Sequence, residues 1–158
     1  MDFEATYQQY GEMLYRIAYI HLGDTYSSED ILQDVFVTLY SNAPKFKTEE
    51  HRKAWLIRVT HNKCINYLKK ASFNSSDVDD LQIPAQADDD DTRIDILQQI
   101  FALPTRYKTV VILYYYNDYS VEEIAKILKI SKSAVKMRLK RSRELLKIQL
   151  EDYDNEQK

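Results

Sequence analysis

Hydrophobic residues recur at three- and four-residue intervals through most of the chain, a spacing that predicts amphipathic helices. Residues 2–22 form the first such segment, and Gly23 is expected to end its helix as the C-cap. The second segment continues to Tyr40 with Ser28 as the expected N-cap, and the third covers 51–70. The first part of the chain therefore reads as three helices joined by short turns.

The third segment has two different sides. Trp55 and Leu56 belong to its apolar side, together with positions one turn further along. The other side carries polar residues spaced by four, which places them on one face: Arg58, Asn62, Asn66 and Lys70. This face is predicted to be free of the core.

The composition changes at residues 72–92, which are polar, acidic and aperiodic. Such a segment buries too little apolar surface to offset its ordering entropy, so it is predicted to be a linker. Its "DDDD" run lacks the alternating ligands and the glycine of a calcium loop, which favours a solvated charge run. The predicted fold class is all-α, with two small helical domains joined by an acidic flexible linker. Their predicted bounds are 1–71, 72–92 for the linker, 93–150, and 151–158 for a polar tail.

The last domain has clear helix-capping signals. A short helix over 94–103 should end at Pro104, and an apolar helix should follow from Thr105 to about Asn117. Ser120 and Glu123 form the S-x-x-E pattern of a capping box. Ser131 is then the expected N-cap of a long last helix over about 132–150. Two helices separated by such a tight turn have the layout of a helix-turn-helix.

The two helices around that turn have separate inner and outer faces. The inner face is apolar, with Ala125 small enough for close approach: Ile124, Ala125, Leu128, Ile130, Val135 and Leu139. The outer face of the second helix is polar and basic: Lys132, Ser133, Lys136, Met137, Lys140 and Arg141. A helix fits the DNA major groove, and its first turns reach base edges while cations neutralise phosphates. The alternative is a basic amphipathic helix that only packs on its neighbour.

The turn itself lacks the expected glycine. Lys129 stands where a residue is often left-handed, a conformation that costs a non-glycine residue roughly 1 kcal/mol. A packed domain tolerates that cost, so the turn is still expected to form with strain at Lys129 or its neighbour.

Composition narrows the class of protein. Only two Gly and three Pro occur among 158 residues, which favours helices over a sheet. The single cysteine, Cys64, excludes an internal disulfide framework and a cysteine-based zinc site, and it suits the cytoplasm. The polar N-terminal segment is not expected to be a signal peptide, and no run approaches the ~18 apolar residues of a membrane span.

Charge is arranged in blocks along the chain. Eight of the residues in 45–70 are basic and two are acidic, and 106–147 holds eleven basic and four acidic residues. The blocks at 1–44, 71–105 and 148–158 are acidic, with net charges of −6, −7 and −3, and together with the basic blocks they give a formal net charge of −3. Two basic blocks on predicted helices favour contact with a polyanion over ordinary solvated faces. The acidic blocks then indicate a basic protein partner.

Three stretches in this order resemble a known family: "SSEDILQDVFVTLY", "KAWLIRVTHNKCINYLKK" and "LPTRYKTVVILYYYNDYSVEEIAKILKISKSAVKMRLKRSR". They are similar to the polymerase-binding, downstream-element and upstream-element segments of the extracytoplasmic-function (ECF) sigma factors of bacterial RNA polymerase. The resemblance implies a non-enzymatic protein that binds core RNA polymerase and promoter DNA. It also implies an anti-sigma factor as a partner, with no small-molecule substrate, cofactor or membrane insertion.

The resemblance implies three sets of contact residues. Core polymerase would meet Asp30, Gln33, Asp34 and Val37, although Asp30 has the alternative role of serving the helix dipole. The downstream (−10) element would meet Lys45, Phe46, Lys47, His51, Arg58, Asn62, Lys63 and Asn66. The upstream (−35) element would meet Arg106 and Lys108 as phosphate contacts and the outer face already given, namely Lys132, Ser133, Lys136, Met137, Lys140 and Arg141.

Several points stay open within this resemblance. Phe46 and Tyr67 can either stack on bases or pack on the protein. The linker can mimic nucleic acid near the RNA exit path or act as a plain tether. Asn66 stands where the family commonly has Asp, and Lys129 where it usually has Gly, so local contacts there can differ.

Two other classes of protein compete. A free-standing DNA-binding regulator would need no exposed acidic face and would usually dimerise. A small helical hydrolase would have to use the Asp run or His21, His51 and His61, which lack a common ligand spacing. No metal site is predicted.

Overall fold

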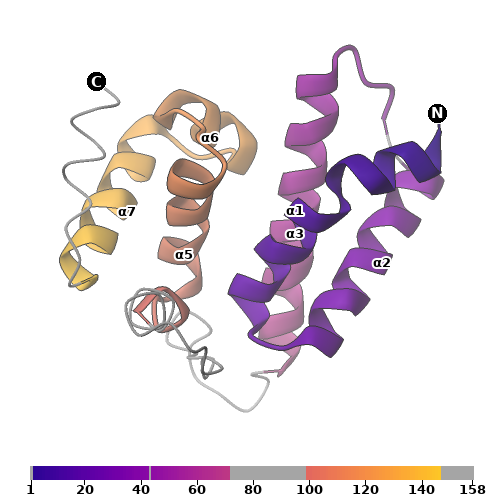
Figure 1. Ribbon diagram of the computed structural model, residues 1–158. Helices are drawn as coiled ribbons and strands as arrows, with labels where there is room; N and C mark the ends of the chain where they lie inside the picture. Colours follow the sequence, from indigo (N-terminus) through magenta and orange to yellow (C-terminus); the bar gives the residue numbers. More distant parts are fainter. Residues whose placement is uncertain (1, 43, 72–98, 147–158) are drawn as a thin grey trace. The chain divides into compact units, whose positions relative to one another are not determined.

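The computed structural model describes residues 2–42, 44–71 and 99–146. Every regular element within these ranges is a helix, which confirms the all-α prediction (Figure 1). The chain divides into two compact units, Met1–Ser76 and Asp77–Lys158. The predicted linker and tail lie outside the described residues.

The first unit is built from α1 (Phe3–Leu22), α2 (Thr25–Asn42) and α3 (Glu49–Ala71). The side chain of Asp2 caps α1 by accepting the amide of Ala5 at 3.1 Å. Gly23 ends α1 with a φ of 80°, and its N–H donates to the Tyr19 carbonyl, which confirms the predicted C-cap. The left-handed conformation explains why glycine stands here.

The start of α2 differs from the prediction, which placed the N-cap at Ser28. The helix begins at Thr25, because the Asp24 carboxylate accepts the amide of Ser27 at 2.7 Å. Ser28 is buried within the helix and its hydroxyl donates to the Asp24 carbonyl. Asp30 therefore lies beyond the first turn, where the helix dipole has little effect, and its alternative role there is not supported.

The core of the first unit lies where the three helices meet. Buried apolar side chains come from every helix, including Leu14, Val35 and Leu56. Trp55 is buried as predicted, whereas Val59 and Ile65 are only half-buried. These contacts fix which sides of α2 and α3 remain outside.

Two histidines from different helices meet inside this core. His21 on α1 and His61 on α3 are fully buried, and their Nε2 and Nδ1 atoms are 2.7 Å apart. No sequence spacing relates the two histidines, since forty residues separate them. Burial lowers the pKa of His61 to about 3, so the ring is neutral at physiological pH.

Acid should therefore destabilise the first unit. In the unfolded chain His61 titrates near its usual pKa of 6.5, so below that pH the unfolded state binds a proton that the folded state excludes. The free energy of unfolding should be fully retained above pH 6.5 and should fall by up to about 1.4 kcal/mol per pH unit as the pH drops towards 3. Urea unfolding followed by the fluorescence of Trp55, the single tryptophan, measures it.

Two variants separate this effect from other titrating groups. His61→Gln should flatten the pH dependence, while His51→Gln, which changes an exposed histidine, should leave it as in the wild type. An unchanged slope in His61→Gln would contradict the assignment.

The second unit contains α5 (Thr105–Val111), the π-helix η2 (Ile112–Tyr116), α6 (Val121–Leu128) and α7 (Lys132–Leu145). The helix predicted from Thr105 is present, but its second half widens, with the Asn117 amide bonded to the Ile112 carbonyl five residues earlier. The predicted helix at 94–103 is described only at its end, where 99–101 are helical. Helix α5 packs on α7, and so does α6.

The caps of α6 and α7 agree with the sequence. The Ser120 hydroxyl accepts the Glu123 amide and the Glu123 carboxylate accepts the Ser120 amide, which completes the capping box. The Ser131 hydroxyl accepts the Ala134 amide at 3.0 Å and caps α7. Of the predicted inner face, Leu128 and Ile130 are half-buried and the rest is buried. The helix-turn-helix is therefore formed as expected.

Lys129 carries the predicted strain of the turn. Its φ of 59° and ψ of 45° are left-handed, and its N–H donates to the Ala125 carbonyl. The next amide, of Ile130, also donates to that carbonyl at 3.1 Å. The backbone hydrogen bonds of the turn thus form only because Lys129 adopts a strained, left-handed backbone conformation.

Replacing Lys129 with glycine should relieve this strain. Lys129→Gly is expected to stabilise the α6–α7 turn by about 0.5–1 kcal/mol, since glycine adopts a positive φ without steric cost. Native-state hydrogen exchange at the Ile130 amide measures the change. Lys129→Ala removes the same charge but keeps Cβ, so equal stabilisation by both variants would contradict the account.

Candidate protein and nucleic-acid interfaces

The outer side of α2 is acidic and exposed. All four predicted polymerase contacts lie there in solvent: Asp30, Gln33, Asp34 and Val37. Leu32 and Phe36 point into the core as predicted. Because the inward side is occupied by α1 and α3, this outer side is available to a partner.

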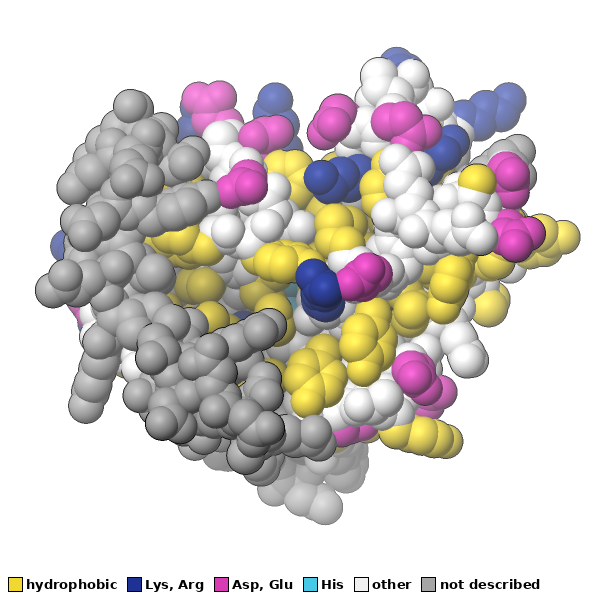
Figure 2. Space-filling model, in the orientation of Figure 1, with side chains coloured by type: hydrophobic (Ala, Val, Ile, Leu, Met, Phe, Trp, Pro, Cys, Tyr) yellow, Lys and Arg dark blue, Asp and Glu magenta, His cyan; other side chains and the backbone are white. Residues whose placement is uncertain are grey.

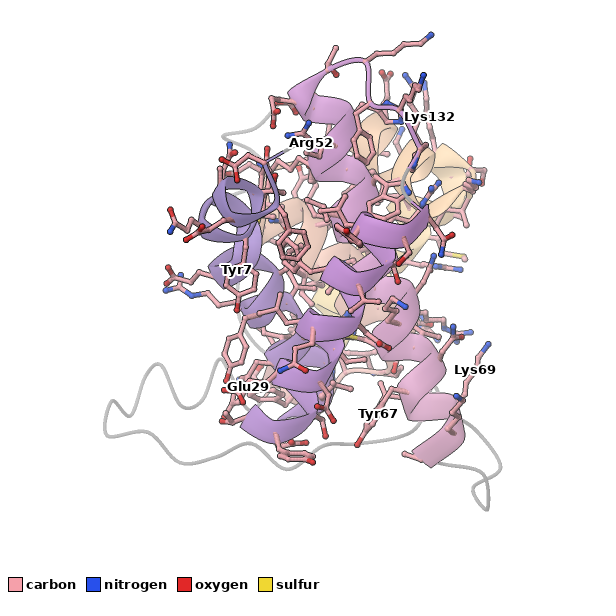
Figure 3. All side chains as sticks on the ribbon, turned by 90° about the vertical axis from the view of Figure 1, so that its right-hand side faces the viewer. Tyr7, Glu29, Arg52, Tyr67, Lys69 and Lys132 are labelled. Carbon is pink, nitrogen blue, oxygen red and sulfur yellow. The ribbon has the colours of Figure 1, made fainter. Side chains whose placement is uncertain are left out.

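Exposed tyrosines extend this outer side in a way that the sequence analysis missed. Tyr26 is 79% exposed, and Tyr40, which helical spacing predicts as the last apolar position of the second segment, is 80% exposed. The spacing 26, 30, 33, 37 and 40 keeps these positions on one face. Figure 3 shows Glu29 projecting from the same helix. The face combines carboxylates with large hydrophobic side chains.

A second hydrophobic surface follows α1. Figure 2 shows a band of hydrophobic side chains along this helix, interrupted by few charges. Phe3 and Tyr7 are partly exposed and stack edge-on or tilted against Phe36, with ring centroids 5.6 and 4.9 Å apart. Phe3 also meets Tyr40, so this cluster continues to the end of the α2 face.

The loop before α3 is anchored by Phe46. Its ring packs edge-on against Trp55 and His51, with centroids 5.6 and 5.4 Å away, and the Arg52 guanidinium lies over it. The side chain is half-buried, so packing is the alternative that the structure supports for it. Lys45 and Lys47, on either side, are exposed.

Arg52 and Glu49 fix the first turn of α3, a feature that the sequence analysis did not use. Arg52 Nη1 bonds to Glu49 at 2.9 Å, and the other carboxylate oxygen accepts the Tyr10 hydroxyl at 2.8 Å. Burial raises the pKa of Tyr10 to about 12, with a smaller contribution from its hydrogen bond to Glu49. The i, i+3 spacing of Glu49 and Arg52 is the sequence signal from which this ion pair could have been predicted.

The outer side of α3 carries the remaining predicted −10 contacts. His51, Asn62 and Asn66 are exposed, whereas Arg58 and Lys63 are half-buried. Lys63 Nζ lies 3.9 Å from Asp34 Oδ2, so α3 and the α2 face are adjacent. Tyr67 bonds through its hydroxyl to Ser27 Oγ at 2.8 Å, and Figure 3 shows it directed from α3 towards the start of α2. Its ring is therefore held by the protein.

The outer side of α7 is exposed along its whole length. It includes all six predicted residues: Lys132, Ser133, Lys136, Met137, Lys140 and Arg141. Met137 is 60% exposed. Val135 and Leu139 anchor the opposite side in the core. The helix thus presents a basic surface with one apolar position.

Of the two predicted phosphate contacts on α5, only Arg106 is accessible. Arg106 is exposed, and its guanidinium stacks on Tyr107 at 4.9 Å and donates to the Tyr107 hydroxyl. Lys108 is only 1% exposed, with its Nζ 5.8 Å from the centre of the Phe101 ring, so that prediction is wrong. Two positions along a helix differ by about 200°, so one residue faces out when the other faces in.

Other kinds of site receive no support in the described ranges 2–42, 44–71 and 99–146. These ranges hold no group of three or more His, Cys, Asp or Glu side chains placed to bind a metal ion. None of their helices has the length and apolar character that crossing a membrane requires.

Each of the two units matches a known family model. Residues 6–73 match the model of Sigma-70 region 2, and residues 93–146 match that of Sigma-70, region 4. The chain is 31% identical to the ECF RNA polymerase sigma factor SigW of Bacillus subtilis, covering 90% of this chain and 86% of SigW. It is 27% identical to the ECF RNA polymerase sigma factor SigM of the same organism, and the match covers 93% of this chain and 94% of SigM.

A solved structure shows the same fold. The sigma factor RpoE from Bartonella quintana, in complex with the anti-sigma factor NepR, superposes with a TM-score of 0.73 over 92% of this chain and 94% of that one, at 23% identity. The helical fold, the two matched regions and the similarity to SigW lead to one assignment. The chain belongs to the ECF sigma factors, which direct promoter-specific transcription by RNA polymerase.

Proposed function

We propose that the first unit binds core RNA polymerase through the outer side of α2 and the −10 element through α3 and the loop 44–48 that precedes it. The observation that carries this division is the separation of charge. The α2 side presents Asp30 and Asp34, while the neighbouring α3 side presents Asn62, Asn66 and cationic residues. One surface suits a basic protein and the other suits DNA.

The −10 surface is suited to separated strands. Lys45 and Lys47 lie on either side of Phe46, whose ring packs on Trp55 and holds the loop against α3. Their charges are therefore placed beside α3, where they can pair with the phosphates of a DNA single strand. Exposed amides such as those of Asn62 and Asn66 can bond to the edges of unstacked bases. Arg58, Lys63 and His51 complete the set.

The second unit reads the −35 element with α7 in the major groove. Lys132, Ser133 and Lys136 lie in the first turns, where side chains reach base edges. Met137 offers an apolar contact, as for a thymine methyl, and Lys140 and Arg141 continue the basic side. Arg106 adds a phosphate contact from α5.

The two units act together through the polymerase. We place the domains at 1–71 and 93–150, with 72–92 as the tether. Each helical domain offers a small DNA interface, so each alone should bind weakly. Binding of both to one polymerase raises the effective concentration of the second contact. The protein performs no chemical step and works in the cytoplasm.

An anti-sigma factor is the proposed regulator. NepR binds RpoE in the solved structure that shares this fold. The hydrophobic band of α1 and the tyrosines of α2 give such a partner apolar area to cover. Covering α2 would block polymerase binding.

The −10 role is tested by Asn62→Ala. The variant should form open complexes about ten times less well, because a base-bonding amide is lost, while its affinity for core polymerase stays unchanged. Permanganate reactivity of unpaired thymines measures opening on a promoter that the wild-type holoenzyme selects from random DNA. Gln8→Ala, which removes an exposed amide on α1, should open that promoter normally. Equal opening by Asn62→Ala and wild type would contradict the −10 assignment.

A further inference from the structure

An ion pair joins the two helices of the helix-turn-helix at their N-terminal ends. Lys132 Nζ donates to Glu122 Oε1 at 3.0 Å, from the first residue of α7 to the first turn of α6. Both side chains are more than half exposed. The pair therefore lies at the solvent edge of the proposed −35 reading surface, and one of its members is a predicted DNA contact.

Glu122 is surrounded by cations of this surface. The hydrogen bond and charge of Lys132 hold its pKa below the usual value, with smaller contributions from Lys126 and Lys136. The carboxylate thus stays ionised beside two lysines of the reading helix. Glu122 thus places a negative charge beside Lys132, a predicted DNA contact, as Glu144 does beside Arg141.

Glu122 makes only a small contribution to helix stability, through its place in the first turn of α6 near the positive end of the helix dipole. The capping box of α6 is made by Ser120 and Glu123, so Glu122 is not the capping residue. An exposed ion pair contributes little to folding, because solvent screens it and two long side chains lose freedom. A role in DNA binding explains the pair better.

We propose that Glu122 is a positioning residue for −35 recognition. Its carboxylate holds the Lys132 amine beside the reading surface, so that this amine pairs less readily with the phosphates of DNA that lacks the −35 sequence. A free lysine is a flexible point charge that pairs with any phosphate. An amine held in place gains most where a base acceptor lies opposite it. This role rests on the proposed function of α7.

The test compares promoter and non-promoter DNA. Full-length protein in the polymerase holoenzyme is titrated with the selected promoter and with the same fragment carrying a scrambled −35 element, over a salt series. Glu122→Gln should raise affinity for the scrambled fragment about three- to tenfold, raise promoter affinity less, and steepen the salt dependence by about one counterion. Unchanged discrimination and salt dependence would overturn the proposal.

Two further variants show whether Glu122 acts through Lys132. Glu144→Gln makes the same charge change in the same unit, at a carboxylate that pairs with Arg141 within α7. Because Arg141 is itself a proposed DNA contact, Glu144→Gln measures the effect of releasing another cation of the reading helix. An effect on discrimination equal to that of Glu122→Gln would show that Lys132 has no special role and would overturn the proposal. In a Lys132→Gln background the effect of Glu122→Gln should disappear, and its persistence would also overturn it.

Lys136→Glu in the same assay separates this proposal from the function of α7. If Lys136→Glu abolishes −35 discrimination while Glu122→Gln changes nothing, α7 reads DNA and the role of Glu122 is wrong. If no α7 variant alters discrimination, the proposed function of α7 itself is wrong and the role of Glu122 fails with it.

Discussion

Asp34→Arg should weaken the binding of core RNA polymerase at least about thirtyfold, equivalent to about 2 kcal/mol. Asp34 is exposed at the middle of the α2 face, next to Asp30 and Val37. Its replacement by arginine would place a positive charge opposite a basic partner surface, and the two would repel each other. The fold should persist, because among the described residues the Asp34 carboxylate makes only a long ion pair, 3.9 Å to Lys63 Nζ. Binding to core polymerase in the absence of DNA measures the effect.

The matched control is Glu12→Arg on α1. Glu12 is exposed and pairs only with Arg16 within the same helix, so its reversal costs about 0.5 kcal/mol of stability. Polymerase affinity should stay within about threefold of wild type. If Asp34→Arg binds as tightly as this control, α2 is not the docking surface.

Lys136→Glu should abolish selection of the −35 element, with a loss of about ten- to hundredfold in promoter affinity. Lys136 lies on the exposed side of α7, one turn after Lys132, where a helix in the major groove reaches bases. Core polymerase affinity should not change, because Lys136 is on the other unit from α2. Holoenzyme binding to intact and scrambled −35 fragments measures the loss.

The same fragments supply the control for Lys136→Glu. The variant should bind the intact promoter no better than the wild type binds the scrambled one, and its use of the −10 element should be preserved. A variant that still prefers the intact −35 element would show that another surface reads it.

Local signals in the sequence were sufficient where the contact partners are neighbours in the chain. The capping box of Ser120 and Glu123, the cap at Ser131 and the left-handed Lys129 each depend on residues within a few positions. The exposure of the α2 and α7 outer sides also followed from helical spacing. The capping error at Ser28 arose because Asp24, four residues earlier, offers a competing cap with a better acceptor.

Tertiary packing decided the features that the sequence did not reveal. Lys108 and Arg106 are both basic and close in sequence, and only the packing of α5 on α7 determines which one is buried. His21 and His61 come from different helices, so no spacing connects them. The widening of the helix at 112–116 likewise leaves no periodic signature, because the apolar run there is continuous.

Reconstituted transcription tests the central claim most directly. Core RNA polymerase is combined with the purified full chain on the selected promoter, and run-off transcripts are measured for the intact promoter and for fragments with either element scrambled. The account predicts transcript only when the chain and both elements are present, with Asp34→Arg inactive on every template. Equal transcription from scrambled templates, or no transcript from the intact promoter, would contradict it.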